Sequence, residues 1–443
     1  MKKLLSIIFI VVLGLTACKK ETSTNNTDTS ATQARDALYS LMNEWYFWYK
    51  NMPTVKTTDY KDPFELMDAM RYKTLDRWSF VSDYNEFMAT MSGTFVGHGI
   101  RLGYDAVNNN VRIVTIYSNS PLYTNGNGGP GVRRGWIIKK LNGTDLAPIF
   151  ASGNSTAYSN LIGASTAGIT NTFIFTTPRG NDTTAVTIKQ TFQVNSVMLC
   201  DTVKLKSGLT GHIVFDAFIE PSSDELKQAF AYLKAQNVQD LILDLRYNTG
   251  GILDVATQLA SYIAGTSVFG TPFIKSSFND KKAASNNATT NFTSINSPLN
   301  LSRLVVITTR ETASASEEVI NGLKSHFTVT TIGDTTNGKP TGMNVWATND
   351  SKYIFAPVTF ELVNSAGQGG FYKGFIPLKY VKDDITHDFR DRNESCYKEA
   401  IYFLEHGTIS TKGTYVYSPV KTYSEKPSLL NNAFKVYKPQ VIK

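Results

Sequence analysis

The stretch Leu241-Ile-Leu-Asp-Leu-Arg-Tyr-Asn-Thr-Gly-Gly251 decides the fold class. Its first five residues are apolar except for Asp244, which is typical of a strand buried on both faces. The polar turn that follows ends in two glycines, which let the backbone curl and expose N–H groups at the edge of a sheet. A helical stretch is predicted next, at 253–264. Strand, turn and helix in this order indicate an α/β domain.

The same alternation extends over residues 193–406, which we predict to be one layered α/β core. Ser223 is the expected N-cap of one of its helices. The run at 276–298, rich in Asn, Ser and Ala, is predicted to be a surface loop. The further predicted elements are strands at 211–215 and 304–308 and helices at 223–236 and 314–326.

Two smaller parts precede this core, and a tail follows it. Residues 34–92 carry apolar and aromatic side chains at three- and four-residue intervals, which predicts a helical segment. Residues 93–192 change to short apolar runs separated by Gly and Asn clusters, which predicts a small, mostly β domain. Residues 407–443 contain few apolar runs, and we interpret them as a C-terminal tail.

The N-terminus has the pattern of an export signal. Two lysines precede an apolar run that ends near Gly14, too short for the ~20 residues of a membrane-spanning helix, so residues 1–17 are interpreted as a signal peptide. Leu15-Thr-Ala-Cys18 resembles the lipobox of bacterial lipoproteins. This resemblance implies lipidation of Cys18, with 18–33 as a flexible tether, and a lipid-anchored protein of the cell envelope, periplasmic or surface-facing. The alternative is a plain secretory signal followed by a chance cysteine.

Composition argues against several other classes of protein. The net charge of +7 is spread along the chain without an arginine-rich run, so no nucleic-acid partner is expected. The sequence contains no HExxH or Walker motif, and we expect neither a metal nor a cofactor. Cys200 and Cys396 have no neighbouring metal-ligand pattern, and two buried thiols are expected rather than a disulfide framework.

Two further motifs carry polar residues of the kinds that serve in catalysis, a serine and a lysine. In Thr312-Ala-Ser314-Ala-Ser316-Glu317, a serine opens a helix among free N–H groups, which suits a developing oxyanion. The same residues also satisfy the S-x-x-E capping box, so this segment alone does not distinguish a nucleophile from a helix cap. Lys339, between Gly338 and Pro340, taken alone is an ordinary loop lysine.

Taken together, these three motifs resemble the C-terminal processing peptidases, also called tail-specific proteases, a family of serine proteases. The separation 339 − 314 = 25 matches the spacing of that family and selects Ser314 rather than Ser316 as the nucleophile. The resemblance covers residues 34–406. It implies a Ser314–Lys339 dyad and an oxyanion hole formed by the amides of Ala315 and of Gly250 or Gly251. A lysine acts as the base only when burial lowers its pKa towards neutrality.

The predicted β domain resembles a PDZ domain. Gly97-His98-Gly99-Ile100 precedes a strand, and Ser118-Asn-Ser-Pro-Leu122 leads to Gly131-Val-Arg-Arg-Gly135. The resemblance implies that the loop of Gly97, His98, Gly99 and Ile100 binds the C-terminal carboxylate of a peptide that pairs as an added strand. The chain departs from the family in a Gly- and Asn-rich insertion at 125–129 and in Trp136, where Asp is usual.

The expected function is that of an envelope serine endopeptidase, cleaving unfolded or C-terminally exposed proteins. One departure concerns the base, because many family members carry Gln four residues after the lysine and this chain has Met343, with an amide only at Asn344. The alternative is a non-catalytic envelope lipoprotein that binds peptides or hydrophobic ligands. A structural or carbohydrate-binding lipoprotein would explain the anchor and the aromatic residues, but it leaves the Ser–Lys spacing unexplained.

Overall fold

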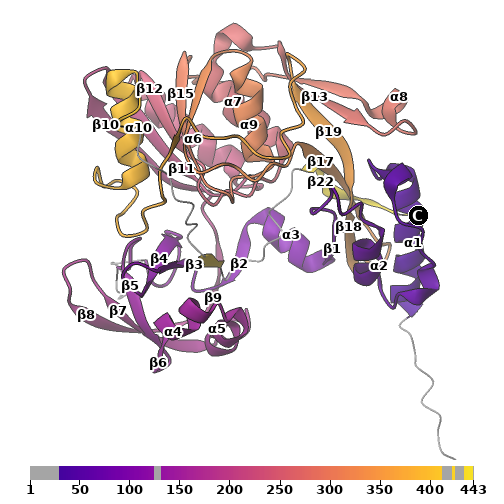
Figure 1. Cartoon of the computed structure of the whole chain (residues 1–443), viewed down its shortest axis with the longest axis horizontal. Helices are drawn as coiled ribbons and strands as arrows, with labels where there is room; N and C mark the ends of the chain where they lie inside the picture. The colour runs from indigo at the N-terminus through magenta and orange to yellow at the C-terminus, as the bar shows by residue number, and fades with distance from the viewer. Residues whose placement is uncertain (1–28, 124–130, 412–421, 425–433, 443) are drawn as a thin grey trace, which may run out of the picture.

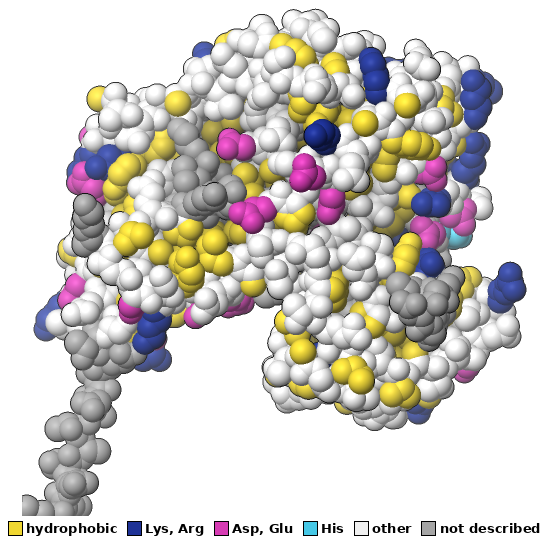
Figure 2. All heavy atoms as spheres, turned by 180° about the vertical axis from the view of Figure 1, so that it is seen from behind, with side chains coloured by type: hydrophobic (Ala, Val, Ile, Leu, Met, Phe, Trp, Pro, Cys, Tyr) yellow, Lys and Arg dark blue, Asp and Glu magenta, His cyan; other side chains and the backbone are white. Residues whose placement is uncertain are grey.

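The computed structural model describes residues 29–123, 131–411, 422–424 and 434–442 of the 443-residue chain. The predicted signal peptide and Cys18 lie outside the described residues. Figure 1 shows the α/β core with the β-rich part below it and the N-terminal helices beside it. From behind, the β-rich part forms a lobe that an open notch separates from the N-terminal side of the molecule (Figure 2).

The centre of the core is a six-stranded sheet, and it confirms the predicted α/β class. All its neighbouring strands pair in parallel except β10, which is antiparallel to β11. Every residue of β12, the strand quoted first above, is buried. The strand order is β10 (Val197–Leu205), β11 (Gly208–Phe215), β12 (Asp240–Asp244), β15 (Arg303–Thr308), β16 (Thr328–Gly333) and β20 (Lys379–Tyr380).

Helices cover both faces of this sheet, which is why β12 has no exposed face. Leu241 and Leu243 pack with α6 (Ser222–Ala235), α7 (Leu253–Ala264) and α9 (Ala315–Lys324) in the main hydrophobic core. Ile242, whose side chain points the other way, packs with α10 (Ser395–His406) in a separate cluster. Figure 1 shows α10 set apart from the other three helices. The predicted helices at 223–236, 253–264 and 314–326 are therefore confirmed within one or two residues at their ends.

A second sheet draws strands from distant parts of the chain. Its antiparallel path begins with β1, which belongs to the N-terminal segment, and β22 from the C-terminal tail lies parallel to β17. The order is β1 (Phe80–Asp83), β18 (Tyr353–Ala356), β17 (Thr341–Ala347), β19 (Val358–Asn364), β13 (Pro272–Phe278) and β14 (Ala288–Asn291), with β22 (Phe434–Val441) beside β17.

Strands occur in three segments for which none was predicted. Residues 34–92 form the helices α1 (Thr29–Trp45), α2 (Pro63–Met70) and α3 (Tyr84–Ser92), but they also contain a strand. The run at 276–298 is not a surface loop throughout, because β13 and β14 pair there around the short helix α8 (Ala283–Asn286). The tail after residue 407 contributes β22 and a second strand, β21 (Thr422–Ser424).

The β-rich part, residues 94–193, has its own hydrophobic cluster and is called the β module below. Its strands confirm a mostly β domain, and β21 of the tail pairs with the edge of β3. A two-stranded ribbon, β2 (Thr94–Gly97) with β9 (Gln190–Gln193), joins it to the rest of the chain. The main sheet runs β21, β3 (Ile100–Asp105), β4 (Asn110–Ile116), β5 (Ile137–Leu141), β7 (Thr170–Thr176) and β8 (Asp182–Ile188), with β6 (Thr144–Asp145) on β5 and helices α4 (Leu146–Ser152) and α5 (Ser155–Ile162).

Two local expectations have clear outcomes. The N-cap of α6 is Pro221 rather than Ser223, and the hydroxyl of Ser222 instead accepts the Ile219 N–H at 3.0 Å. Cys200 and Cys396 are free thiols, half-buried and buried respectively, so no disulfide joins them. None of the helices that the structure describes is long and apolar enough to cross a membrane.

The arginine of the Asp244-Leu-Arg246 motif fixes the end of β12 to the rest of the core. Its guanidinium is fully buried and bonds to Asp244 at 2.6 Å and to Asp383 and Glu394 at 2.8 Å each. Glu394 is also the N-cap of α10, accepting the Tyr397 N–H at 2.8 Å. One buried cation therefore connects the central strand to the helix on its outer face.

Arg246→Met should lower the free energy of unfolding by about 3–5 kcal/mol, because it leaves buried carboxylates without their cation. The matched control is Lys139→Met, which removes a half-exposed ion pair to Asp182 and should cost less than about 1 kcal/mol. Urea unfolding measures both variants. Equal, small changes would show that the buried cluster is not a structural tie.

Candidate active site

Ser314 lies at the sharp turn between β15 and α9, as the N-cap of that helix. Its backbone has φ 63° and ψ −117°, a combination that a residue with a Cβ adopts only under strain. Among the described residues nothing accepts from or donates to its Oγ, and the side chain is 0 % exposed. A strained strand-to-helix turn is also how other hydrolase folds present a nucleophilic serine. The turn has the shape that a nucleophilic serine needs, and the carboxylate of Glu317 also accepts the Ser314 N–H as in a capping box.

Lys339 lies in the loop between β16 and β17 and is 0 % exposed. Burial away from water lowers the pKa of its amine well below the usual range, and the charges of Asp76 and Glu317 only partly oppose that effect. Its Nζ lies 3.8 Å from Met343 Sδ and 5.9 Å from the centre of the Trp78 ring. These soft and aromatic neighbours replace water around the amine, so Lys339 has the environment that a lysine base needs.

A single carboxylate brings the serine and the lysine segments together. Glu317 Oε2 accepts the Ser314 N–H at 2.9 Å and the Lys339 N–H at 2.8 Å. Its other oxygen accepts the Gly338 N–H and the Thr336 hydroxyl, each at 2.6 Å. Burial raises the pKa of Glu317, while these four hydrogen bonds act in the opposite direction. The two predicted catalytic residues therefore flank one oxygen atom, although their side chains are not hydrogen-bonded to each other.

The glycine turn after β12 packs directly on the serine. A Cβ at Gly250 would lie 2.8 Å from Ser314 Cβ and 3.0 Å from the Ala315 nitrogen, and Gly250 has φ 99°. A Cβ at Gly251 would lie 2.1 Å from the Phe218 carbonyl oxygen. Both positions therefore require glycine for space as well as for conformation. The structure places the first motif against the second, as the sequence predicted.

The predicted oxyanion donors differ in availability. Ala315 is the first residue of α9, where an N–H has no acceptor within the helix. The Gly250 N–H donates to Asn248 Oδ1 at 2.9 Å and is thus already engaged. The bridge to Phe218 uses the Gly250 carbonyl and the Ile252 N–H, not the Gly251 N–H. The N–H groups of Ala315 and Gly251 are consequently better placed than that of Gly250 to donate to a new acceptor.

Met343 occupies the position beside the lysine where related chains carry an amide. Its side chain is fully buried, and a thioether is a weak hydrogen-bond acceptor. The neighbouring Asn344 donates its backbone N–H to Thr359 Oγ1, and its side-chain oxygen has no hydrogen-bond partner among the described residues. Asn344 does not substitute for the missing amide.

Sequence reasoning missed three contributors to this site. Glu317 was visible as the fourth residue of a capping box, but its contact with the lysine loop is tertiary. Asn248 holds the glycine turn, donating to the Phe215 carbonyl at 2.8 Å. Trp78, from the N-terminal segment, contacts the amine and donates to Asn337 Oδ1 at 3.4 Å. Nothing in the sequence around Trp78 indicated this role.

The predicted peptide-binding loop lies in the β module. Gly97, His98, Gly99 and Ile100 are all buried, and His98 Nε2 is 2.7 Å from Asn171 Oδ1. The next residue, Arg101, forms an ion pair with Glu311, which precedes Ser314 by three positions. The loop is therefore joined to the serine turn through β3 rather than directly.

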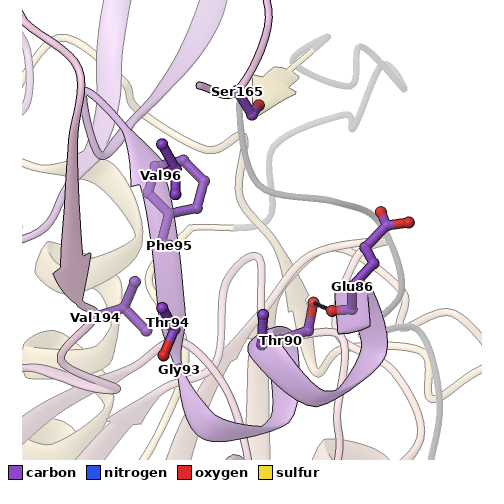
Figure 3. A pocket seen from close by; sticks show the side chains of 9 residues that line it. Glu86, Thr90, Gly93, Thr94, Phe95, Val96, Ser165 and Val194 are labelled. Atoms are coloured by element: carbon purple, nitrogen blue, oxygen red, sulfur yellow. Dashed lines mark hydrogen bonds between the residues drawn. The ribbon is translucent and has the colours of Figure 1, made fainter. Parts of the chain in front are cut away.

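Two described cavities lie elsewhere. One, of about 200 Å³, is mostly apolar and lies where α3 meets β2, lined among others by Thr90, Phe95 and Val194 (Figure 3). The other, of about 300 Å³, is lined by residues of the β module and the core that include Arg134 and Phe389. Neither is lined by Ser314 or Lys339.

Comparison with known proteins agrees with this geometry. Residues 209–377 match the description of peptidase family S41, and residues 33–80 match the S41 N-terminal domain. These two regions of the chain belong to peptidase family S41. This is a family of serine peptidases, and the S41 match spans both Ser314 and Lys339.

Individual relatives are distant from this S41 chain. A probable CtpA-like serine protease of Staphylococcus aureus is 24% identical over 346 residues, covering 76% of this chain and 62% of the relative. Its Staphylococcus epidermidis counterpart is 23% identical with the same coverage. The chain thus spans less than two thirds of the length of these relatives. A crystal structure of a putative S41 protease from Bacteroides fragilis has a TM-score of 0.69 at 21% identity, covering 84% of this chain and 97% of that one, which supports the fold.

Gly250→Ala should destabilise the protein more than Gly143→Ala does. Both glycines have positive φ, so each alanine is strained by about 1 kcal/mol or more, but a Cβ at Gly143 meets nothing within 4 Å. At Gly250 the new methyl group overlaps Ser314 and should add about 1–3 kcal/mol. Chemical denaturation tests the difference. Equal losses would mean that the turn can move away from the serine.

The buried amine of Lys339 should make stability depend on pH. Because its pKa is lower in the folded than in the unfolded state, unfolding takes up a proton, and the free energy of unfolding rises with pH from the lowered pKa to ~10.4. Lys339→Met removes this contribution. The stability gained by the variant over the wild type should therefore shrink as pH rises through that window. A constant difference in urea unfolding across the window would show that Lys339 stays charged.

Proposed function

We propose that this S41 chain is a serine endopeptidase in which Ser314 is the nucleophile and Lys339 the general base. The observation that carries the proposal is the Glu317 oxygen bonded to the backbone N–H groups of both residues. Such an arrangement holds two segments that are 25 residues apart in sequence (339 − 314) next to each other in the fold. Ser–Lys pairs are an established variant of the serine-protease arrangement.

The reaction follows from the two environments. Neutral Lys339 Nζ takes the proton of Ser314 Oγ as this oxygen attacks the peptide carbonyl carbon. The negative oxygen that results is stabilised by the N–H groups of Ala315 and Gly251, and each such donor is worth about 10²–10³ in turnover. The ammonium then gives its proton to the leaving amine. Water attacks the acyl-enzyme by the same route, again with the lysine as base.

Catalysis by this site requires local movement. Ser314 and Lys339 are both 0 % exposed, and their side chains do not hydrogen-bond to each other. The Gly250 N–H is held by Asn248. Hydrogen bonds at catalytic sites often tighten only when substrate binds. We therefore propose that the conformation described is a resting one, which a polypeptide substrate opens.

Our proposals for the substrate and for the location rest on two parts of the chain outside the dyad, the β module and the N-terminal sequence. The β module resembles a PDZ domain, which supports a role in capturing or gating unfolded or C-terminally exposed polypeptides. The lipobox-like sequence at Cys18 supports attachment to the membrane of a bacterial cell envelope.

One observation favours a second candidate, a non-catalytic protein that binds peptides or hydrophobic ligands. The serine is buried, and an inactive relative could keep such a site closed permanently. A fluorophosphonate probe, which reacts with activated serines, separates the two functions. Labelling of Ser314 in the folded protein, found by peptide mapping, supports the peptidase. Absence of labelling, even with an unfolded polypeptide present, supports the binding protein.

Ser314→Ala and Lys339→Met should each reduce cleavage of an unstructured, dye-labelled polypeptide by at least about 10³-fold, because neither residue has a substitute. Ser316→Ala is the matched control: that hydroxyl donates to the Asn248 carbonyl at 3.2 Å, and its loss should leave most of the activity. Circular dichroism checks folding. Full activity in either of the first two variants would refute the dyad.

A further inference from the structure

The tail strand β21 lies on the outer edge of β3, in antiparallel register. Thr422 pairs with Gly103, Tyr423 with Leu102 and Ser424 with Arg101. The tail therefore runs towards the start of β3, where the Gly97–Ile100 loop ends. This is the way in which an extended peptide adds to the free edge of a sheet.

Three parts of the molecule meet at one carboxylate beside this edge. Glu311 Oε1 accepts the hydroxyl of Thr422 at 2.7 Å, while its Oε2 pairs with the guanidinium of Arg101. Glu311 precedes Ser314 by three residues, in the loop that leads to the buried serine. The tail, the edge strand of the β module and the serine turn are thus joined by a single side chain.

The pairing of β21 is short enough to be exchanged. A backbone hydrogen bond contributes only about 0.5–1.5 kcal/mol net, and β21 has three residues. The next described strand of the tail, β22, pairs separately with β17 in the core. A competing peptide needs to displace only the short strand, and β22 can stay in place.

We propose that the edge of β3, together with Glu311, is a docking site for an extended polypeptide, and that the chain's own Thr422–Ser424 occupies it until a substrate displaces it. The carboxylate of Glu311 gives the site a preference. It selects a hydroxyl or a cationic side chain opposite Gly103 and repels Asp or Glu there. The inference rests on the proposed peptidase function in one respect only, which is that the incoming polypeptide is called a substrate. Docking itself requires no catalysis.

Binding is measured with the full chain carrying Ser314→Ala, so that nothing is cleaved. The test variant adds Thr422→Pro and Tyr423→Pro. Successive N–H groups point to opposite sides of a strand, so one of the two prolines removes a bond to β3. The matched control carries Thr411→Pro and Lys412→Pro, earlier in the same tail. Circular dichroism confirms that all three proteins are folded.

The probe is a fluorescein-labelled peptide with the sequence of residues 420–426, followed by fluorescence anisotropy. A tethered strand competes at millimolar effective concentration, so freeing the edge should lower the Kd of the peptide by about tenfold or more in the test variant alone. Equal affinity in the three proteins, or no binding in any of them, would overturn the proposal.

Peptide variants test the role of Glu311. Replacing the threonine of the probe by Val should weaken binding several-fold, and by Asp more strongly, whereas Lys should retain it. If the Asp peptide binds as tightly as the Thr peptide, Glu311 does not select the ligand.

Cleavage distinguishes this proposal from the proposed function. With Ser314 restored, Thr422→Pro with Tyr423→Pro should lower the KM for an unstructured polypeptide and leave kcat unchanged. Peptide binding without any cleavage would contradict the peptidase and leave the docking site standing. Cleavage with an unchanged KM would contradict the docking site and leave the peptidase standing.

Discussion

The carboxylate of Glu317 is the interaction on which the site depends. Four donors converge on its two oxygens, from the serine turn and from the loop that carries the lysine. A buried carboxylate is costly unless such donors surround it, so each segment helps to keep the other in place. The strain at Ser314 persists for the same reason, because the Ser314 N–H is held at one side of the residue and Gly250 packs against the other.

Much of the core follows from local pattern. The fully buried β12, the helical spacing at 253–264 and the serine-led helix at 314–326 are each determined by residues close in sequence, and the structure has all three. The pairing of Ser314 with Lys339 also came from sequence, but through their spacing and a family resemblance. Nothing in either segment alone indicated it.

The elements that escaped prediction are those with distant partners. β1 and β22 are short or mixed in polarity, and they become strands because β18 and β17 provide edges for them. The pair β13 and β14 escaped because its turn is rich in Asn and Ser and resembles a loop. Trp78 and Glu317 escaped for a related reason, since each satisfies a local rule, as core aromatic or helix cap, and takes its second role from a contact across the fold.

The second sheet has a consequence for the order in which the molecule is completed. Its strands come from distant parts of the chain. The strands β17 and β18 follow Lys339 directly, and they pair with β22 and β1 respectively. Contacts between such distant positions are slow to form, because a long loop must close before they gain any energy. Synthesis from the N-terminus supplies β22 after every other strand of this sheet. The surroundings of the lysine therefore reach their final form only after a segment far beyond Lys339 has been made, so that assembly of this site waits for a later part of the chain.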